Sequence, residues 1–156
     1  MSYSFNQSQI DIAATIIRVG QQMGATFTQI RAALAAAWVE SRFQNLSYGD
    51  RDSLGVFQQR PSQGLGTAAQ IMNVEYAASK FYVAAKRVSN AGTAGEIAQR
   101  VQRSAYPSRY DEQIGAADEI LRRLGNLPAS DGVFAGSIGV EIALFVGLGL
   151  VILLTD

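Results

Sequence analysis

Glu40 is the first residue in the chain whose type and setting point to chemistry. It lies in the stretch AAAWVESRFQN, residues 35–45, where an acid follows a run of alanines, a tryptophan and a valine. Burial among apolar groups and the negative end of a helix dipole both raise the pKa of a carboxyl group. An acid that is protonated near neutral pH can donate a proton to a leaving group. A second interpretation is that the carboxylate reaches solvent or pairs with Arg42.

The composition restricts the chemistry that the chain can perform. Its 156 residues include no histidine and no cysteine, which excludes Ser–His dyads, thiolate nucleophiles and the usual zinc sites. Lys and Arg number 13, as do Asp and Glu, so the formal net charge is zero. No overall field therefore favours nucleic acid as a partner. The sequence predicts no cofactor and no metal site, because the ligand spacing of a calcium-binding loop is absent as well.

Helical patterns dominate the chain and predict a mainly α fold. The spacing of apolar residues predicts helices over residues 7–23, 27–43, 68–88 with a break near Asn73, 94–105 and 109–124. Helix starts are marked by Ser or Thr followed three residues later by Gln, Glu or Asp, at Thr26, Thr67, Thr93 and, more weakly, Ser108. Gly125 is typical of a residue that ends a helix. The only long irregular segment covers residues 44–66, and such loops often carry function.

The predicted helix over residues 27–43 would place Glu40 in a poorly solvated position. On a helical wheel this segment is apolar almost all the way round, which is typical of a buried helix. Glu40 falls on the side of Ala33, Ala36 and Ala37, whose small side chains let another segment approach closely. The sequence therefore predicts an acid close to the end of a buried helix.

The end of the sequence has a different character from the rest. Residues 126–132 are typical of a linker, and residues 133–154 form an apolar run with one charge, Glu141. As a helix this run would be about 33 Å long, against a hydrocarbon core of about 30 Å. Its Leu, Ile, Val and Phe residues outweigh the cost of about 3 kcal/mol for one acid. We expect a transmembrane or membrane-active helix after a domain of residues 1–125, with a helix buried in a large assembly as the alternative.

Three short motifs occur in order around Glu40 and carry a family resemblance. They are ES at residues 40–41, GVFQ at residues 55–58 and AYP at residues 105–107. With these motifs, residues 8–124 resemble the catalytic core of lysozyme-like lytic transglycosylases, in the goose-lysozyme-related superfamily, of the actinobacterial and phage type. The resemblance implies a lysozyme-like helical domain with one long irregular loop. The third motif departs from the family pattern, because Pro107 stands where the family has an amide.

The resemblance implies that the domain cleaves peptidoglycan between N-acetylmuramic acid and N-acetylglucosamine. Glu40 would protonate the glycosidic oxygen. As a carboxylate it would then take a proton from the C6 hydroxyl of muramic acid, which closes a 1,6-anhydro ring. One carboxylate would serve both steps, although hydrolysis of the lysozyme type stays open. The resemblance assigns the following residues to substrate binding: Ser41, Gly55, Gln58, Gln59, Tyr106 and, more weakly, Tyr110.

Several of these positions have a second interpretation. Gly55 also suits a turn that requires positive φ, and the two glutamines suit an exposed polar loop. Tyr106 either forms a hydrogen bond with Glu40 or with the substrate, or it is an aromatic residue of the core. Asp50 or Asp52 would be the second carboxylate if the enzyme hydrolyses its substrate. We favour the interpretation that these two acids cap turns and pair with Arg51 or Arg60.

The order of the segments predicts where such an enzyme would act. The N-terminus lacks a basic region followed by an apolar one, so we expect no secretory signal peptide. Arg122 and Arg123 precede the apolar run, and the positive-inside rule would keep the domain in the cytoplasm, where there is no peptidoglycan. We therefore expect a virion component, in an internal membrane or a tail, that opens the wall locally during phage entry. It would contact other virion proteins or copies of itself. The alternatives are a structural virion protein with an inactive lysozyme-like domain, and a cellular membrane-anchored enzyme that remodels the wall.

Overall fold

The computed structural model of the protein describes residues 3–125, and within this range it contains α-helices and no β-strand. The helices are α1 (Gln7–Gln22), α2 (Phe27–Ser41), α3 (Ala68–Ile71), α4 (Val74–Arg87), α5 (Ala94–Gln102), α6 (Arg109–Glu112) and α7 (Ile114–Arg123), with a 3-10 turn, η1, at Pro61–Gln63. The predicted mainly α class is confirmed. The predicted linker at residues 126–132 and the predicted membrane helix at residues 133–154 lie outside the described residues.

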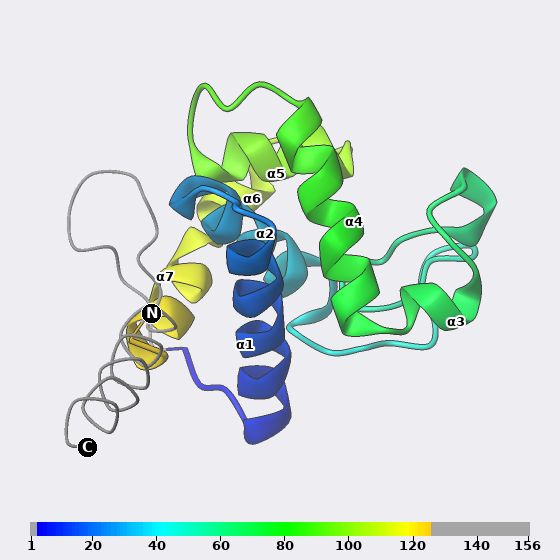
Figure 1. The fold of residues 1–156 in the computed structure, drawn as a ribbon, viewed down its shortest axis with the longest axis horizontal. Coiled ribbons are helices and arrows are strands. Elements are labelled where there is room, and N and C mark those ends of the chain that lie inside the picture. Colours follow the sequence, from blue (N-terminus) through cyan, green and yellow to red (C-terminus); the bar gives the residue numbers. More distant parts are fainter. Residues whose placement is uncertain (1–2, 126–156) are drawn as a thin grey trace, which may run out of the picture.

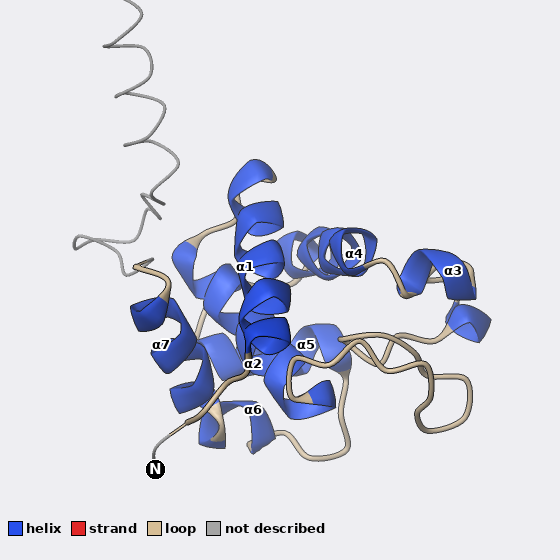
Figure 2. Cartoon of the chain, turned by 90° about the horizontal axis from the view of Figure 1, so that it is seen from below, coloured by secondary structure: helices blue, strands red, loops and turns tan. Residues whose placement is uncertain are grey.

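Helix α2 lies at the centre of the helical body. Helices α1, α4, α5, α6 and α7 all pack against it (Figure 1, Figure 2). Its alanines are fully buried, namely Ala32, Ala33, Ala35, Ala36 and Ala37. Because these side chains are small, five helices can approach one central helix closely. This burial is what an apolar surface all the way round a helix predicts.

The predicted helix starts at three threonines are confirmed. Each threonine accepts a hydrogen bond from the backbone N–H three residues later, and that residue's side chain binds the threonine's own N–H, for Thr26, Thr67 and Thr93. Such reciprocal capping satisfies two backbone donors that a helix leaves unpaired at its start. The predicted break near Asn73 is also confirmed, since Asn73 caps α4.

Two features of the helix boundaries differ from the prediction. Ser108 was expected to cap a helix, but its hydroxyl donates to the Glu112 carboxylate at 2.6 Å and caps no backbone group. The helix expected over residues 109–124 is divided at Gln113, where φ is −105° and ψ is 10°. The side-chain oxygen of Gln113 accepts a hydrogen bond from the Trp38 indole at 3.3 Å. This long-range contact with α2 accompanies the break between α6 and α7.

Residues 44–73 form a second part of the fold, which extends from the helical body beyond α4 (Figure 1, Figure 2). The loop is held by its own backbone, as in the hydrogen bond of 2.7 Å from Gly55 N to the Leu46 carbonyl. It is also packed on the helices, because the buried Phe57 ring stacks on Phe81 of α4 at 5.0 Å between centroids. We call residues 44–73 the loop lobe.

The N-terminal segment covers the end of α2 on another side. Phe5 and Tyr3 both pack edge-on against Trp38, at 5.4 and 5.7 Å between ring centroids, and Phe5 lies tilted against Phe43 at 5.9 Å. Arg123, at the end of α7, donates to the Tyr3 carbonyl at 2.7 Å and lies 5.0 Å from the Phe5 ring. We call these four rings, Tyr3, Phe5, Trp38 and Phe43, the aromatic clasp. It joins both ends of the described chain to the C-terminal end of α2.

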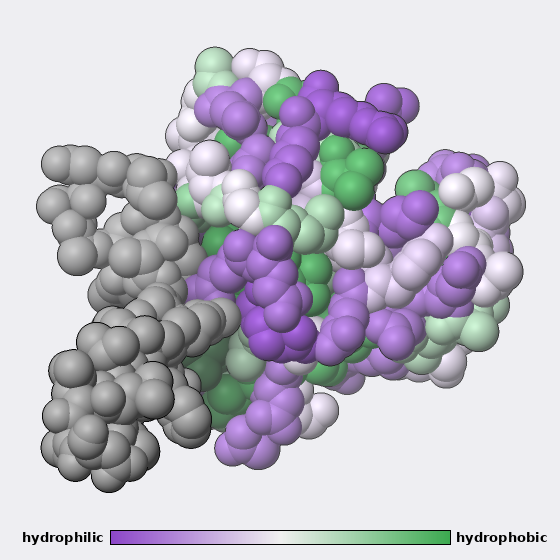
Figure 3. Space-filling view, in the orientation of Figure 1, coloured by the Kyte–Doolittle hydropathy of each residue, from purple (hydrophilic) through white to green (hydrophobic). Residues whose placement is uncertain are grey.

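The outer surface is mainly hydrophilic on the face that Figure 1 presents. Figure 3 shows polar residues over most of this face, interrupted by small, separate hydrophobic patches. Scattered apolar side chains of this kind are normal on a folded domain. Among residues 3–125, no helix combines the length and the hydropathy that crossing a bilayer requires.

Candidate active site

Glu40 occupies the last turn of α2, where the chain leaves the helix abruptly. The two residues that follow the helix both adopt left-handed backbone conformations, with φ of 56° at Arg42 and 55° at Phe43. The Phe43 side chain is fully buried in the aromatic clasp, so the change of direction is fixed by packing. Glu40 itself is partly exposed, although the residues on either side of it, Val39 and Ser41, are buried. Glu40 therefore lies at the boundary between the buried core and the solvent.

Tyr110 of α6 is the residue that holds the Glu40 carboxylate. Its hydroxyl donates a hydrogen bond of 2.6 Å to Oε1 of Glu40, and the tyrosine is fully buried. Burial, and then the hydrogen bond to Glu40 and its charge, raise the pKa of the Tyr110 hydroxyl, while Ser104 and Arg109 act in the opposite direction. The hydroxyl therefore remains a neutral donor throughout the pH range in which enzymes work. It fixes one carboxylate oxygen and leaves Oε2 for another group.

The alternative in which Glu40 pairs with Arg42 is wrong. The Arg42 guanidinium lies 4.6 Å from the centre of the Trp38 ring and donates to Gln113 at 3.4 Å. Within residues 3–125, no ion pair involves Glu40. The site thus contains a carboxylate held by a neutral hydroxyl and not by a cation.

Ser41 connects the end of α2 to the loop lobe. Its hydroxyl lies 2.8 Å from the Val56 carbonyl and 3.0 Å from the Ala37 carbonyl, and it accepts from the backbone N–H of Gln44 at 3.2 Å. Ser41 is 5% exposed. The sequence predicted a residue that binds substrate, but the structure places Ser41 between two protein segments. Its contribution to the site is to set the position of residues 55–58 relative to Glu40.

Gly55 has the backbone conformation and the packing that only glycine accommodates. Its φ is +75°, and a β-carbon at this position would lie 2.7 Å from the Ile71 carbonyl oxygen. The second interpretation of Gly55, a turn with positive φ, is therefore confirmed. Because Gly55 is buried against α3, its surroundings in the structure are protein.

The two glutamines of the loop lobe have different surroundings. The Gln58 amide donates to the carbonyls of Tyr48 at 3.2 Å and Gly55 at 3.1 Å, and the residue is partly exposed. Gln59 is buried, and its amide donates to the Ala77 carbonyl of α4 at 3.1 Å, while its Oε1 has no hydrogen-bond partner. Gln58 is thus near the surface of the loop lobe, whereas Gln59 is directed toward α4.

The structure reverses the order of the two candidate tyrosines, Tyr106 and Tyr110, as partners of Glu40. Tyr106, in the AYP motif, is 68% exposed, so the interpretation as a core aromatic residue is wrong. The stronger candidate partner of Glu40 was Tyr106, but the structure gives that contact to Tyr110. Tyr48, 70% exposed in the loop lobe, was not singled out from the sequence. An aromatic residue in a segment of Gly, Ser and Asp is a signal that would have drawn attention to it.

The two candidate second carboxylates are in turns of the loop lobe. Asp52 lies 2.6 Å from the Arg60 guanidinium and accepts from the backbone N–H of Ser62 at 2.8 Å and from its hydroxyl at 3.0 Å. The Ser62 backbone, Arg60 and the Ser62 hydroxyl hold the pKa of the Asp52 carboxyl well below its usual range. Asp50 is exposed, and its carbonyl accepts from Ser53 N at 3.0 Å. For Asp52, the expected pairing with Arg60 and the role in a turn are confirmed.

One further residue fixes the loop lobe to the helical body near the site. The Gln102 amide, at the end of α5, donates to the Phe57 carbonyl at 3.1 Å. No motif pointed to it, because a glutamine at a helix end has no distinctive sequence signal. Among the described residues, no three acidic side chains gather closely enough to hold a metal ion.

Comparisons with other proteins do not assign the chain to a family. No model of a known protein family matches the sequence, and a search of curated proteins finds no match.

Proposed function

We propose that residues 3–125 form a lytic transglycosylase domain that cleaves glycan strands of peptidoglycan between N-acetylmuramic acid and N-acetylglucosamine. The observation that carries this proposal is the Glu40 carboxylate at the end of a buried helix, with the Tyr110 hydroxyl 2.6 Å from its Oε1. The lysozyme-like resemblance of the ES, GVFQ and AYP motifs supplies the substrate class. The bond from Ser41 to Val56 supports the same assignment, since it joins two of these motifs in space.

In the proposed reaction Glu40 acts first as an acid and then as a base. Its proton passes to the oxygen that leaves as the O4 hydroxyl of N-acetylglucosamine, while the bond from this oxygen to C1 of muramic acid breaks. The resulting carboxylate takes the proton of the C6 hydroxyl, and O6 bonds to C1. Glu40 is then protonated again, so the cycle needs no water and no second carboxylate.

The state of Asp52 supports transglycosylation over hydrolysis. A hydrolase uses a second carboxylate as nucleophile or to activate water. The oxygens of Asp52 already accept hydrogen bonds from Arg60 and Ser62, so this carboxylate is occupied in maintaining the loop. A mechanism in which Glu40 serves both steps requires nothing further from either aspartate.

We propose that the glycan strand lies between the loop lobe and the loop that follows α5. Tyr48 and Tyr106 present exposed rings on these two segments, and flat apolar surfaces with a polar edge suit sugar rings. Gln58, next to Tyr48, would offer its amide to the acetamido or hydroxyl groups of the sugars. Gln59, Ser41 and Gly55 would act on the substrate only by holding this loop.

The location of the enzyme is a proposal from the sequence. We propose that it belongs to a virion and that residues 133–154 bring it to a membrane during phage entry. A reporter fused to these residues is expected to remain in the membrane fraction after extraction with alkaline carbonate. A fusion that is released by carbonate would contradict the membrane role without affecting the proposed reaction.

The decisive experiment compares wild type with Glu40→Gln on purified murein. Glutamine keeps the size of the side chain and can still accept from Tyr110, but it has no proton to donate, so cleavage is expected to fall by at least about a thousandfold. Mass spectrometry of the wild-type products is expected to show 1,6-anhydromuramic ends, because hydrolysis would add one water.

Glu75→Gln is a suitable control, since Glu75 is an exposed acid of α4 paired with Arg18. Cleavage by Glu40→Gln at the wild-type rate would remove Glu40 from the mechanism. Reducing muramic ends in the wild-type digest would make the enzyme a lysozyme and direct attention to Asp50 and Asp52.

A further inference from the structure

Helix α6 is too short to fix Tyr110 by itself. It comprises only Arg109–Glu112, and Tyr110 is its only buried residue. An isolated turn of helix has little stability in water. The place of the Tyr110 hydroxyl must therefore be set by contacts between α6 and its neighbours.

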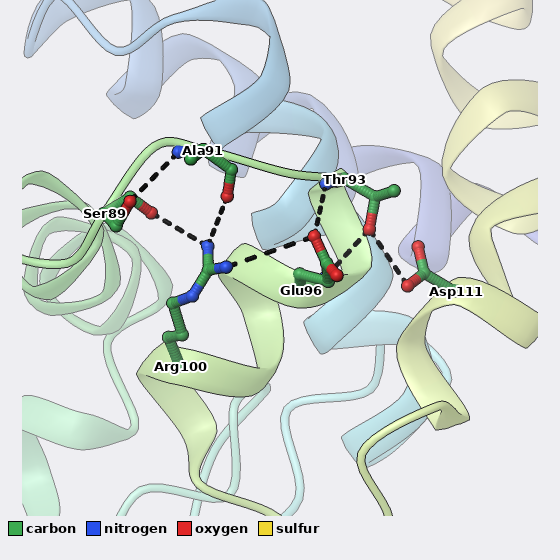
Figure 4. A network of polar contacts seen from close by, with 6 residues as sticks. All are labelled: Ser89, Ala91, Thr93, Glu96, Arg100 and Asp111. Atoms are coloured by element: carbon green, nitrogen blue, oxygen red, sulfur yellow. Dashed lines mark hydrogen bonds and ion pairs between the residues drawn. The ribbon is translucent and has the colours of Figure 1, made fainter.

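Besides the bond from Tyr110 to Glu40, α6 makes a polar contact with the N-terminus of α5. The Thr93 hydroxyl donates to Oδ2 of Asp111 at 2.9 Å while it accepts from the backbone N–H of Glu96 at 3.1 Å (Figure 4). In return, Oε2 of Glu96 accepts from Thr93 N at 2.9 Å. The Thr93 hydroxyl thus acts as an acceptor in the capping box and as a donor to Asp111, the residue next to Tyr110.

The segment around this contact is tightly built. A β-carbon on Gly95 would lie 2.5 Å from the backbone nitrogen of Asp111, so α5 and α6 approach as closely as their backbones allow. The Arg100 guanidinium donates to the carbonyls of Ser89 at 3.0 Å and Ala91 at 2.6 Å, which fixes the loop before Thr93 (Figure 4). These contacts fix the position of the Thr93 hydroxyl independently of its bond to Asp111.

We propose that Thr93 is a positioning residue of the site, which fixes α6 through Asp111 and so keeps the Tyr110 hydroxyl on Glu40. The catalytic consequence rests on the proposed function. The structural part does not, because it concerns the position of α6 alone. Neither Thr93 nor Asp111 belongs to the three motifs that drew attention to the site.

Three variants separate positioning from helix capping. Thr93→Val loses both the cap and the bond to Asp111, and Asp111→Ala loses the bond but keeps the cap. Thr93→Ser keeps a hydroxyl that can make both contacts. Thr26→Val is the matched control, because Thr26 caps α2 with the same geometry but lies at the helix end remote from Glu40.

The sole tryptophan supplies a readout that needs no substrate. The Trp38 indole donates to Gln113, the residue that follows α6. When α6 is released, this bond weakens and the indole becomes more accessible. We expect acrylamide to quench Trp38 fluorescence more strongly in Thr93→Val and Asp111→Ala than in wild type, Thr93→Ser and Thr26→Val.

The same variants are measured on murein. Displacement of the Tyr110 hydroxyl is expected to lower kcat roughly ten- to a hundredfold in Thr93→Val and Asp111→Ala, with KM within about twofold. Thr93→Ser is expected to restore kcat, and Thr26→Val to lower the melting temperature while it leaves kcat unchanged. In a double-mutant cycle, Thr93→Val is expected to add little to Tyr110→Phe.

Two results would overturn the inference. One is quenching of Trp38 in Thr93→Val and Asp111→Ala that equals the wild type. The other is a full additional loss of kcat when Thr93→Val is combined with Tyr110→Phe. A wild-type protein that does not cleave murein would defeat the proposed function instead, and Trp38 quenching would then decide whether Thr93 fixes α6.

Discussion

Glu40 is held by a neutral donor, and this partner suits the reaction proposed above, in which the acid gives and then takes a proton. A cation beside a carboxylate favours its charged form, and the only nearby cation on the same helix end, Arg42, is engaged with Trp38 and Gln113. The Tyr110 hydroxyl fixes the orientation of the carboxylate without adding a full charge. The Tyr110 hydroxyl therefore orients the carboxylate as the proposed reaction requires.

We expect Tyr110→Phe to lower kcat with little change in KM. Phenylalanine keeps the ring in its buried position and removes only the donor to Glu40, so the carboxylate loses its fixed orientation. The expected loss is roughly tenfold to a hundredfold in kcat, measured by release of soluble murein fragments. Tyr82→Phe is the control, because the buried Tyr82 hydroxyl donates to the Ile16 carbonyl at 2.9 Å and not to the site. Equal kcat values for Tyr110→Phe and Tyr82→Phe would show that the Tyr110 hydroxyl plays no part in the reaction.

At the scale of elements, local signals were predictable from the sequence and long-range ones were not. The caps at Thr26, Thr67 and Thr93 are formed within four residues, so their pattern is visible in the sequence. The break at Gln113 coincides with a contact with Trp38, 75 positions away, and no local pattern reveals it. The same reason explains why Tyr110 was ranked below Tyr106, since only the folded chain brings α6 to the end of α2.

The long loop was predicted in position but not in character. Its composition of Gly, Ser, Asn and Asp indicates irregular structure, and this is what the chain adopts. The composition did not indicate that Val56 and Phe57 would be buried or that Gln59 would point at α4. The candidate residues of this loop divide accordingly into those that support the site and those, such as Gln58, that are near its surface.

Two glycines of the loop lobe allow its packing to be tested. Gly55 and Gly64 have nearly the same φ, +75° and +74°, but a β-carbon would clash with the Ile71 carbonyl only at Gly55. We expect Gly64→Ala to lower the free energy of unfolding by about 1 kcal/mol, the backbone cost alone, and Gly55→Ala to cost more, because α3 must move. Urea denaturation measures both values. Equal costs would show that the contact with α3 is not close in solution.

At the scale of the whole molecule, two ion pairs link helices of the body to one another, and neither involves Glu40. Arg31 of α2 makes two bonds to Asp118 of α7, at 2.6 and 2.7 Å, and Arg18 of α1 pairs with Glu75 of α4. The first pair ties α2 to α7, and the second ties α1 to α4. Exposed pairs contribute little individually, so burial of the apolar side chains around α2 contributes more to the stability of the helical body.

We expect Glu119 to contribute to the loss of thermal stability at low pH. Hydrogen bonds from Arg122 and then Arg123 lower the pKa of the Glu119 carboxyl to about 2, from an ordinary value of 4.5. A carboxyl whose pKa is depressed in the folded state stabilises the fold above its unfolded pKa, and this contribution disappears as pH falls through the folded value. We expect the melting temperature to fall between about pH 4.5 and about pH 2, and to fall less steeply in Glu119→Gln. Asp50→Asn is the control, and calorimetry at a series of pH values measures the melting temperature of each protein. The same dependence of melting temperature on pH in wild type, Glu119→Gln and Asp50→Asn would contradict the assignment.

The aromatic clasp has a consequence for the order in which the chain can be completed during synthesis. Tyr3 is synthesised well before Arg123, yet its carbonyl accepts a hydrogen bond from Arg123, 120 positions later. Contacts of such long sequence separation form late and slowly. Until α7 has emerged, a nascent chain lacks the arginine that covers the Tyr3–Phe5 segment, so the rings around Trp38 and the end of α2 stay incompletely enclosed. Translation itself thus delays the moment at which Glu40 acquires its final surroundings.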